Sequence, residues 1–139
     1  MRAAISAFFV FVFCLTSMAA FAADPDFHKQ PPFTGEELKQ FMTDFPAYRE
    51  WAIANKDSSG PAVASGNIPS FNWTLGAETY LKKNTSWEPS RFFYVMTHVF
   101  AGFEIIKFGD MVTGENRPPD MPVVPDSELV LLKPLLQGQ

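Results

Sequence analysis

The chain has 139 residues, of which 47% are hydrophobic and 19% charged, and its formal net charge at pH 7 is −4. This length and composition predict one globular domain and exclude disorder along the whole chain. Eleven Lys and Arg residues against fifteen Asp and Glu residues leave no excess of positive charge. Nucleic-acid binding rests largely on such an excess, so we expect no nucleic-acid partner.

Residues 1–22 have the three parts of a secretory signal peptide. Arg2 supplies the positive charge, an apolar stretch runs from Ala3, and small residues follow up to Ala22. Signal peptidase requires small side chains just before the cut, so we expect cleavage between Ala22 and Ala23. An uncleaved anchor is the alternative, but the apolar stretch is shorter than the ~20 residues of a membrane span. The sequence therefore predicts a periplasmic or secreted protein with no membrane span after cleavage.

The mature chain is expected to have no cysteine. Cys14, the single cysteine, lies inside the apolar stretch and is not preceded by the pattern of a lipoprotein cleavage site. We therefore expect no lipid anchor, no disulfide and no thiolate ligand. Residues 23–32 are polar and rich in proline, which is typical of an extended leader. A single helical domain is expected over residues 33–139, with the fold beginning at Phe33.

The first predicted helix begins at a capping box formed by Thr34 and Glu37. Apolar residues then recur at spacings of three and four residues to about Asn55, as on one face of a helix. Pro46 interrupts this stripe. We expect either a kink at the proline or two short helices that meet there.

Residues 56–72 are rich in glycine, proline and serine, and exceed the ordinary connection of ~4–6 residues. We expect a surface loop, with Ile68 and Phe71 holding its end to the core; a functional loop is the alternative. Nowhere is an alternation of apolar and polar residues long enough to predict a sheet.

A second helix is predicted over residues 73–83, with Leu75, Thr79 and Tyr80 facing inward. Gly76 disfavours this helix by ~1 kcal/mol relative to alanine. A third, Pro89–Phe108, is apolar nearly all round and is therefore expected to be the buried central helix.

A membrane span is the alternative for the central helix, but His98 and Glu104 within it argue against that role. A proline-rich loop follows, and a short helix after Pro125 presents several leucines. The predicted fold class is all-α: a small bundle of about four to five helices around the central helix, with long loops rich in proline and glycine.

Three side chains of the central helix make a candidate binding face. Arg91, Tyr94 and His98 follow one another at spacings of three and four residues, so they share one side of the helix. Their donors suit an anion, and Gly102 leaves room for a ligand or a close helix. The alternative is structural, because lone polar residues on an apolar helix more often satisfy groups inside a bundle.

Trp73 and Trp87 are further candidate binding residues, because they lie near predicted helix ends, where large amphipathic rings often contact a partner or ligand. They serve equally well as lids on a small core. We expect no metal site, since His28 and His98 are the only histidines and lack ligand spacing, and we expect no cofactor. No spacing marks a catalytic residue.

Two stretches carry a resemblance: residues 33–46, which begin Phe-Thr-Gly-Glu-Glu-Leu, and residues 87–102, which begin Trp-Glu-Pro-Ser-Arg-Phe. They resemble small uncharacterised secreted bacterial proteins that are all-helical. The resemblance implies an exported helical domain and no established activity.

The leading hypothesis is an exported non-enzymatic helical domain that binds an envelope or secreted protein partner, or a small ligand, through aromatic surface around the central helix. One alternative is a small exported hydrolase that uses Glu104 or His98 with a loop serine. Another is an envelope-stress protein that acts like a chaperone, which predicts dimers and promiscuous binding of unfolded chains.

Overall fold

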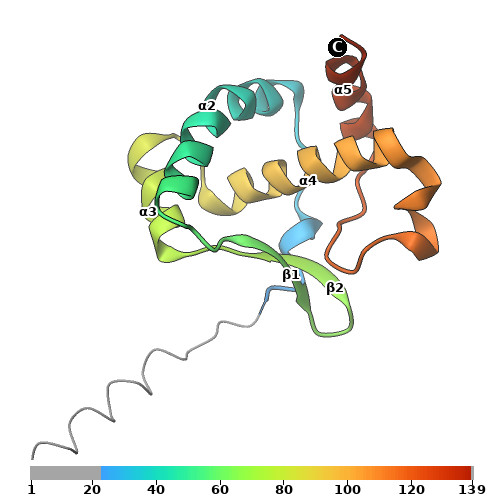
Figure 1. Cartoon of the computed structure of the whole chain (residues 1–139), viewed down its shortest axis with the longest axis horizontal. Coiled ribbons are helices and arrows are strands. Elements are labelled where there is room, and N and C mark those ends of the chain that lie inside the picture. The colour runs from blue at the N-terminus through green and yellow to red at the C-terminus, as the bar shows by residue number, and fades with distance from the viewer. Residues whose placement is uncertain (1–22, 139) are drawn as a thin grey trace, which may run out of the picture.

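The computed structural model describes residues 23–138, so the predicted signal peptide, residues 1–22, lies outside the described residues. Helices dominate, and one small antiparallel sheet accompanies them (Figure 1). The α-helices are α2 (Gly35–Ala54), α3 (Leu75–Asn84), α4 (Pro89–Phe108) and α5 (Asp126–Gln137). The strands are β1 (Gly60–Ala64) and β2 (Ile68–Asn72), and the short 3-10 helices are η1 (Phe27–Lys29), η2 (Gly109–Met111) and η3 (Gly114–Asn116). The mostly helical architecture agrees with the predicted class, and the sheet departs from it.

The predicted loop 56–72 instead contains a β-hairpin. Its two strands pair in a register that runs from Gly60 opposite Asn72 to Ala64 opposite Ile68. The turn places Gly66 (φ 82°) and Asn67 (φ 57°) in the left-handed region, which these two residue types tolerate best. Phe71 is buried, as predicted, whereas Ile68 is exposed. The hairpin therefore holds to the core by its second strand.

α2 begins at the predicted capping box. The Thr34 hydroxyl accepts a hydrogen bond from the Glu37 N–H (3.2 Å), and the Glu37 carboxylate accepts one from the Thr34 N–H (3.1 Å). The helix then continues through Pro46 to Ala54, so of the two predicted outcomes the pair of short helices is wrong. Pro46 lies on the exposed side, where water can satisfy the carbonyl that its missing N–H leaves free.

α3 occupies the predicted segment but buries a different face. Leu75 and Thr79, predicted to face inward, are exposed, while Ala77 and Leu81 are fully buried. Positions two residues apart differ by about 200° around a helix. Because Ala77 and Leu81 face the core, Leu75 and Thr79 lie on the opposite side of the helix, toward solvent.

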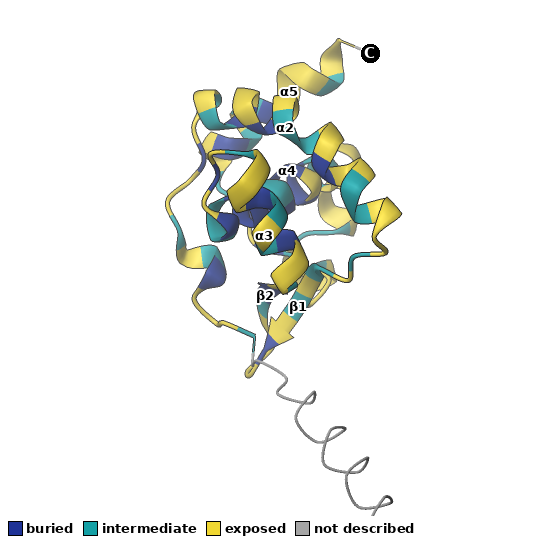
Figure 2. Ribbon diagram, turned by 90° about the vertical axis from the view of Figure 1, so that its left-hand side faces the viewer, coloured by how far each residue is buried: buried dark blue, intermediate teal, exposed yellow. Residues whose placement is uncertain are grey.

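α4 is the central helix of the described chain. α2, α3, α5 and η1 all contact it, and Figure 2 shows buried positions gathered along it and on the faces around it. Its fully buried residues end at Gly102, so its last turns are partly exposed. By length and composition the stretch Pro89–Met111 is apolar enough to cross a membrane, but half of it is buried and the core helix of a soluble protein meets the same weak criterion.

α5 packs closely against α4 at Gly102. A Cβ atom at this position would lie 2.3 Å from Cδ1 of Leu132, a fully buried residue of α5. Of the two predicted uses of Gly102, the structure therefore has the close helix and not a space for a ligand.

The predicted extended leader is part of the domain. Phe27, in η1, is buried, and its ring packs against that of Phe71, with 5.9 Å between the ring centres. The Asp24 carbonyl accepts a hydrogen bond from the Ser70 hydroxyl (2.6 Å), which ties the leader to β2. The prediction that the fold begins at Phe33 is therefore wrong, because the core already includes Phe27.

Candidate functional site

An open cleft of about 600 Å³ lies between α4, the hairpin and the loop of residues 112–122. This volume falls within the range of about 300–1,000 Å³ that is usual for small-molecule sites. Charged groups lie among its lining residues at Glu104, Lys107 and Asp120. The apolar side chains that line it include Phe71, Met96, Phe100, Phe103, Met121 and Pro122.

The side of α4 that faces the cleft is covered only in part by α2, whose Phe45 ring packs on that of Phe100 with 5.3 Å between ring centres. Met96, Phe100 and Phe103 follow one another at spacings of three and four residues, so they share that side. Phe100 is 45% exposed, which is unusual for a large apolar side chain on a core helix. The opposite walls come from the hairpin and from a loop that prolines stiffen. An apolar surface therefore faces an open space.

The predicted anion-binding face of α4 is formed, but the anion it holds belongs to the protein. The Tyr94 hydroxyl donates to Glu128 (2.9 Å), and Nδ1 of His98 lies 2.5 Å from the other oxygen of that carboxylate. The Phe33 N–H donates to Glu128 as well (2.9 Å). Glu128, from α5, is fully buried. Its carboxylate occupies the position in which the sequence analysis expected a ligand.

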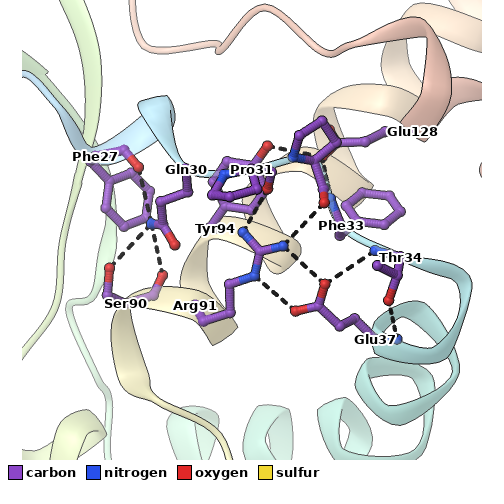
Figure 3. A network of polar contacts seen from close by, with 11 residues as sticks. Phe27, Gln30, Pro31, Phe33, Thr34, Glu37, Ser90, Arg91, Tyr94 and Glu128 are labelled. Carbon is purple, nitrogen blue, oxygen red and sulfur yellow. Dashed lines mark hydrogen bonds and ion pairs between the residues drawn. The ribbon is translucent and has the colours of Figure 1, made fainter.

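Arg91, the third residue of that face, binds α2 and the leader (Figure 3). Its Nε and Nη2 donate to the two oxygens of Glu37 at 2.8 and 2.9 Å, and this contact lowers the pKa of that carboxyl. Its guanidinium also donates to the carbonyls of Pro31 and Pro32. All three predicted side chains are thus occupied by protein groups, which favours their structural interpretation.

His28 joins this network from the leader, a contact that sequence reasoning missed. Its Nδ1 lies 3.0 Å from Nε2 of His98. A carboxylate can only accept, so Nδ1 of His98 carries the hydrogen toward Glu128, and one hydrogen lies between Nε2 of His98 and Nδ1 of His28. This leaves Nε2 of His28 buried without a hydrogen-bond partner in the described chain. The two histidines are 70 positions apart, and no local pattern in the sequence connects them.

Burial is the main cause that lowers the pKa of His28 from its ordinary 6.5 to about 4, and the electrostatic effect of the neighbouring His98 is the second. The Ser70 backbone and Glu128 raise this pKa, but by less. Between these two values the unfolded chain binds more protons than the folded chain. The free energy of unfolding is therefore expected to rise with pH from about 4 to 6.5, and the contribution of His28 to be constant above that window. Urea unfolding across this range, in the wild type and in His28→Asn, measures the slope. Equal slopes in the two proteins would contradict this assignment.

Trp73 and Trp87, the other predicted binding residues, cover the core. Trp87 is buried, and its indole N–H donates to Asp44 (3.0 Å). Trp73 is half-buried, stacks on Phe93 with 5.6 Å between ring centres, and has its indole N–H 3.3 Å from a Glu78 carboxylate oxygen. Both indole rings pack against the core and both indole N–H groups have partners within the protein. These contacts favour the alternative interpretation, in which the two tryptophans cover the core.

The structure divides the residues of the hydrolase alternative, because Glu104 and the loop residue Ser59 line the cleft and His98 does not. His98 is buried, bonded to Glu128 and His28, and is not among the residues that line the cleft. Glu104 and Ser59 do line it, but the Ser59 hydroxyl accepts a hydrogen bond from the Thr74 N–H (2.9 Å). Within residues 23–138, no group of three or more histidine or acidic side chains is placed to hold a metal ion.

A scan of family models and searches of curated proteins and of solved structures found no match to this chain. The resemblance to small secreted helical proteins therefore stays a prediction. The evidence on function lies in the cleft and in the residues around it.

Proposed function

We propose that the protein is an exported, non-enzymatic domain that binds a small apolar or amphiphilic molecule in the cleft beside α4. Export is supported by the signal-peptide pattern of residues 1–22. Ligand binding is supported by one observation above all: a space of about 600 Å³ is lined mainly by apolar side chains, among them Phe100, which is 45% exposed. Water is a poor occupant of such a surface, so an apolar molecule gains free energy by displacing it.

The shape of the site favours a small molecule over a protein partner. Protein–protein interfaces are mostly broad surfaces of about 800 Å² on each side, whereas small ligands are held in concave sites. The cleft is concave, with α4, the hairpin and the proline-rich loop as three separate walls. An apolar chain or ring that enters it contacts all three.

Fluorescence of Nile red, a neutral apolar dye, tests this proposal. We expect a saturable rise in fluorescence with one dye bound per chain. Ala101, a buried cleft residue, has a short side chain, and Ala101→Phe is expected to fill part of the space and weaken dye binding at least tenfold. The matched control is Ala47→Phe, which adds the same side chain at an exposed position of α2.

The larger side chain at position 101 also risks disturbing the core, so thermal unfolding of both variants accompanies the titrations. Met121→Trp fills the cleft from the loop wall and is expected to weaken dye binding without touching α4. Absence of saturable binding to the wild type would refute the proposal. Unchanged binding to two folded variants with filled clefts would refute it as well.

A further inference from the structure

A second hollow adjoins the cleft. This hollow, about 320 Å³ in volume, lies beside α2 and the residues that follow it. Ser59 and Met96 line both spaces, so the two adjoin at these residues. We call the two adjoining spaces the trough, which reaches from the proline-rich loop, past Met96 of α4, to the end of α2. A ligand longer than the cleft would enter the second hollow beside Ser59 and Met96.

The second hollow contains two cations that have no acidic partner. Arg49 and Lys56 both line it and are both exposed. Neither belongs to an ion pair within residues 23–138. Arg49 lies in the last turns of α2 and Lys56 follows its end, and both side chains border the same hollow. Unpaired cations on one side of a hollow are notable in a chain whose acidic residues outnumber its basic ones.

The one acidic residue among those that line this hollow is engaged elsewhere. Asp57 also lines the hollow, but one of its oxygens accepts from the Thr74 hydroxyl (2.5 Å) and the other from the Ser59 N–H (3.1 Å). Two positive charges against one negative charge therefore surround this end of the trough. At the other end Glu104 and Asp120 outnumber Lys107. The charge of the trough thus changes sign along its length, and the positive end is the one beside α2.

We infer that the trough binds a single-chain amphiphile with an anionic head group, whose apolar chain lies in the cleft and whose head group lies between Arg49 and Lys56. The inference rests on the proposed function for the apolar part and adds the head group. Exposed cations attract a carboxylate or phosphate most strongly at low salt, because mobile ions screen such pairs. Carboxylate and phosphate amphiphiles both meet the requirement of the site, which is a negative charge at one end of an apolar chain.

Calorimetric titration with three ligands of equal chain length tests the inference, at concentrations below those that form micelles. Dodecanoate has an anionic head, dodecanol a neutral one and dodecylamine a cationic one. We expect dodecanoate to bind about tenfold more tightly than dodecanol, and dodecylamine to bind most weakly. The preference for dodecanoate is expected to shrink as salt is added.

The double variant Arg49→Gln/Lys56→Gln is expected to weaken dodecanoate binding about tenfold and to leave dodecanol binding unchanged. The matched control is Lys39→Gln/Lys133→Gln, which removes two exposed cations that line neither hollow. Dodecyl phosphate in the same titrations distinguishes the two anionic head groups.

The outcomes separate the two proposals. Equal binding of all three ligands would overturn the inference that the ligand has an anionic head group, and so would undiminished dodecanoate binding by the double variant. Either result would leave the proposal of an apolar ligand in the cleft intact. Tighter binding of dodecylamine would place the head group at the acidic end instead and would also overturn the inference. Failure of all three ligands to bind would overturn the proposed function with it.

Discussion

Replacement of Glu128 by alanine is expected to lower the free energy of unfolding by ~3–5 kcal/mol. The buried carboxylate accepts from the Tyr94 hydroxyl, the Phe33 N–H and His98, all of which lose their partner in the variant. Each unsatisfied buried donor costs ~1–3 kcal/mol. Urea unfolding monitored by circular dichroism measures the loss.

Two controls accompany this prediction. Glu128→Gln keeps the shape and an accepting oxygen, so its loss is expected to be smaller than that of alanine. Glu50→Ala removes an exposed acid from α2, and its effect is expected to stay within ~0.5 kcal/mol. A loss below ~1 kcal/mol for Glu128→Ala would show that the network does not hold the leader and α5 to α4.

Phe93→Ala is the second substitution expected to have a large effect, with a loss of ~3–5 kcal/mol in the free energy of unfolding. Phe93 is fully buried in α4 and stacks on Phe71 of the hairpin, with 4.8 Å between ring centres. It also stacks on Trp73, with 5.6 Å between ring centres. Removal of the ring leaves a cavity where the hairpin meets the core helix, so amide exchange in β2 is expected to become faster as well.

The matched control for this substitution is Phe108→Ala in the same helix. Phe108 is 46% exposed, so its loss is expected to stay below ~1 kcal/mol. Comparable losses for the two phenylalanines would contradict the burial that the structure gives to Phe93.

Local patterns predicted the helices well, because helix ends and helix faces are set by residues close together in the sequence. The capping box of Thr34 and Glu37 and the apolar length of α4 are of this kind. Pro46 misled the prediction, since a proline on the exposed side of a helix costs one hydrogen bond without ending it.

The hairpin escaped prediction because its first strand lacks large apolar residues and both strands contain proline. β1 is built from glycine, proline, alanine and valine, and Pro61 and Pro69 argue against strands in general. A two-stranded sheet consists of edges alone, where proline is tolerated. A better signal was the Gly66–Asn67 pair, whose residues suit the positive φ angles of a tight turn.

The candidate site depends on contacts between distant parts of the chain, which spacing does not reveal. The helix face of Arg91, Tyr94 and His98 could be predicted, but Glu128, 34 positions after Tyr94, supplies the anion. The cleft needs the hairpin and the proline-rich loop on either side of α4. The one local signal of the cleft was the number of apolar residues on α4, which is larger than the neighbouring helices cover.

Methionine methyl NMR tests binding in the cleft most directly. Met96 and Met121 line opposite walls of the cleft, whereas Met42, on α2, is exposed and lines neither hollow. During titration with dodecanoate, the methyl signals of Met96 and Met121 are expected to shift together and saturate, with Met42 unchanged. Signals that stay in place at Met96 and Met121, or that shift equally at Met42, would contradict a ligand site in the cleft.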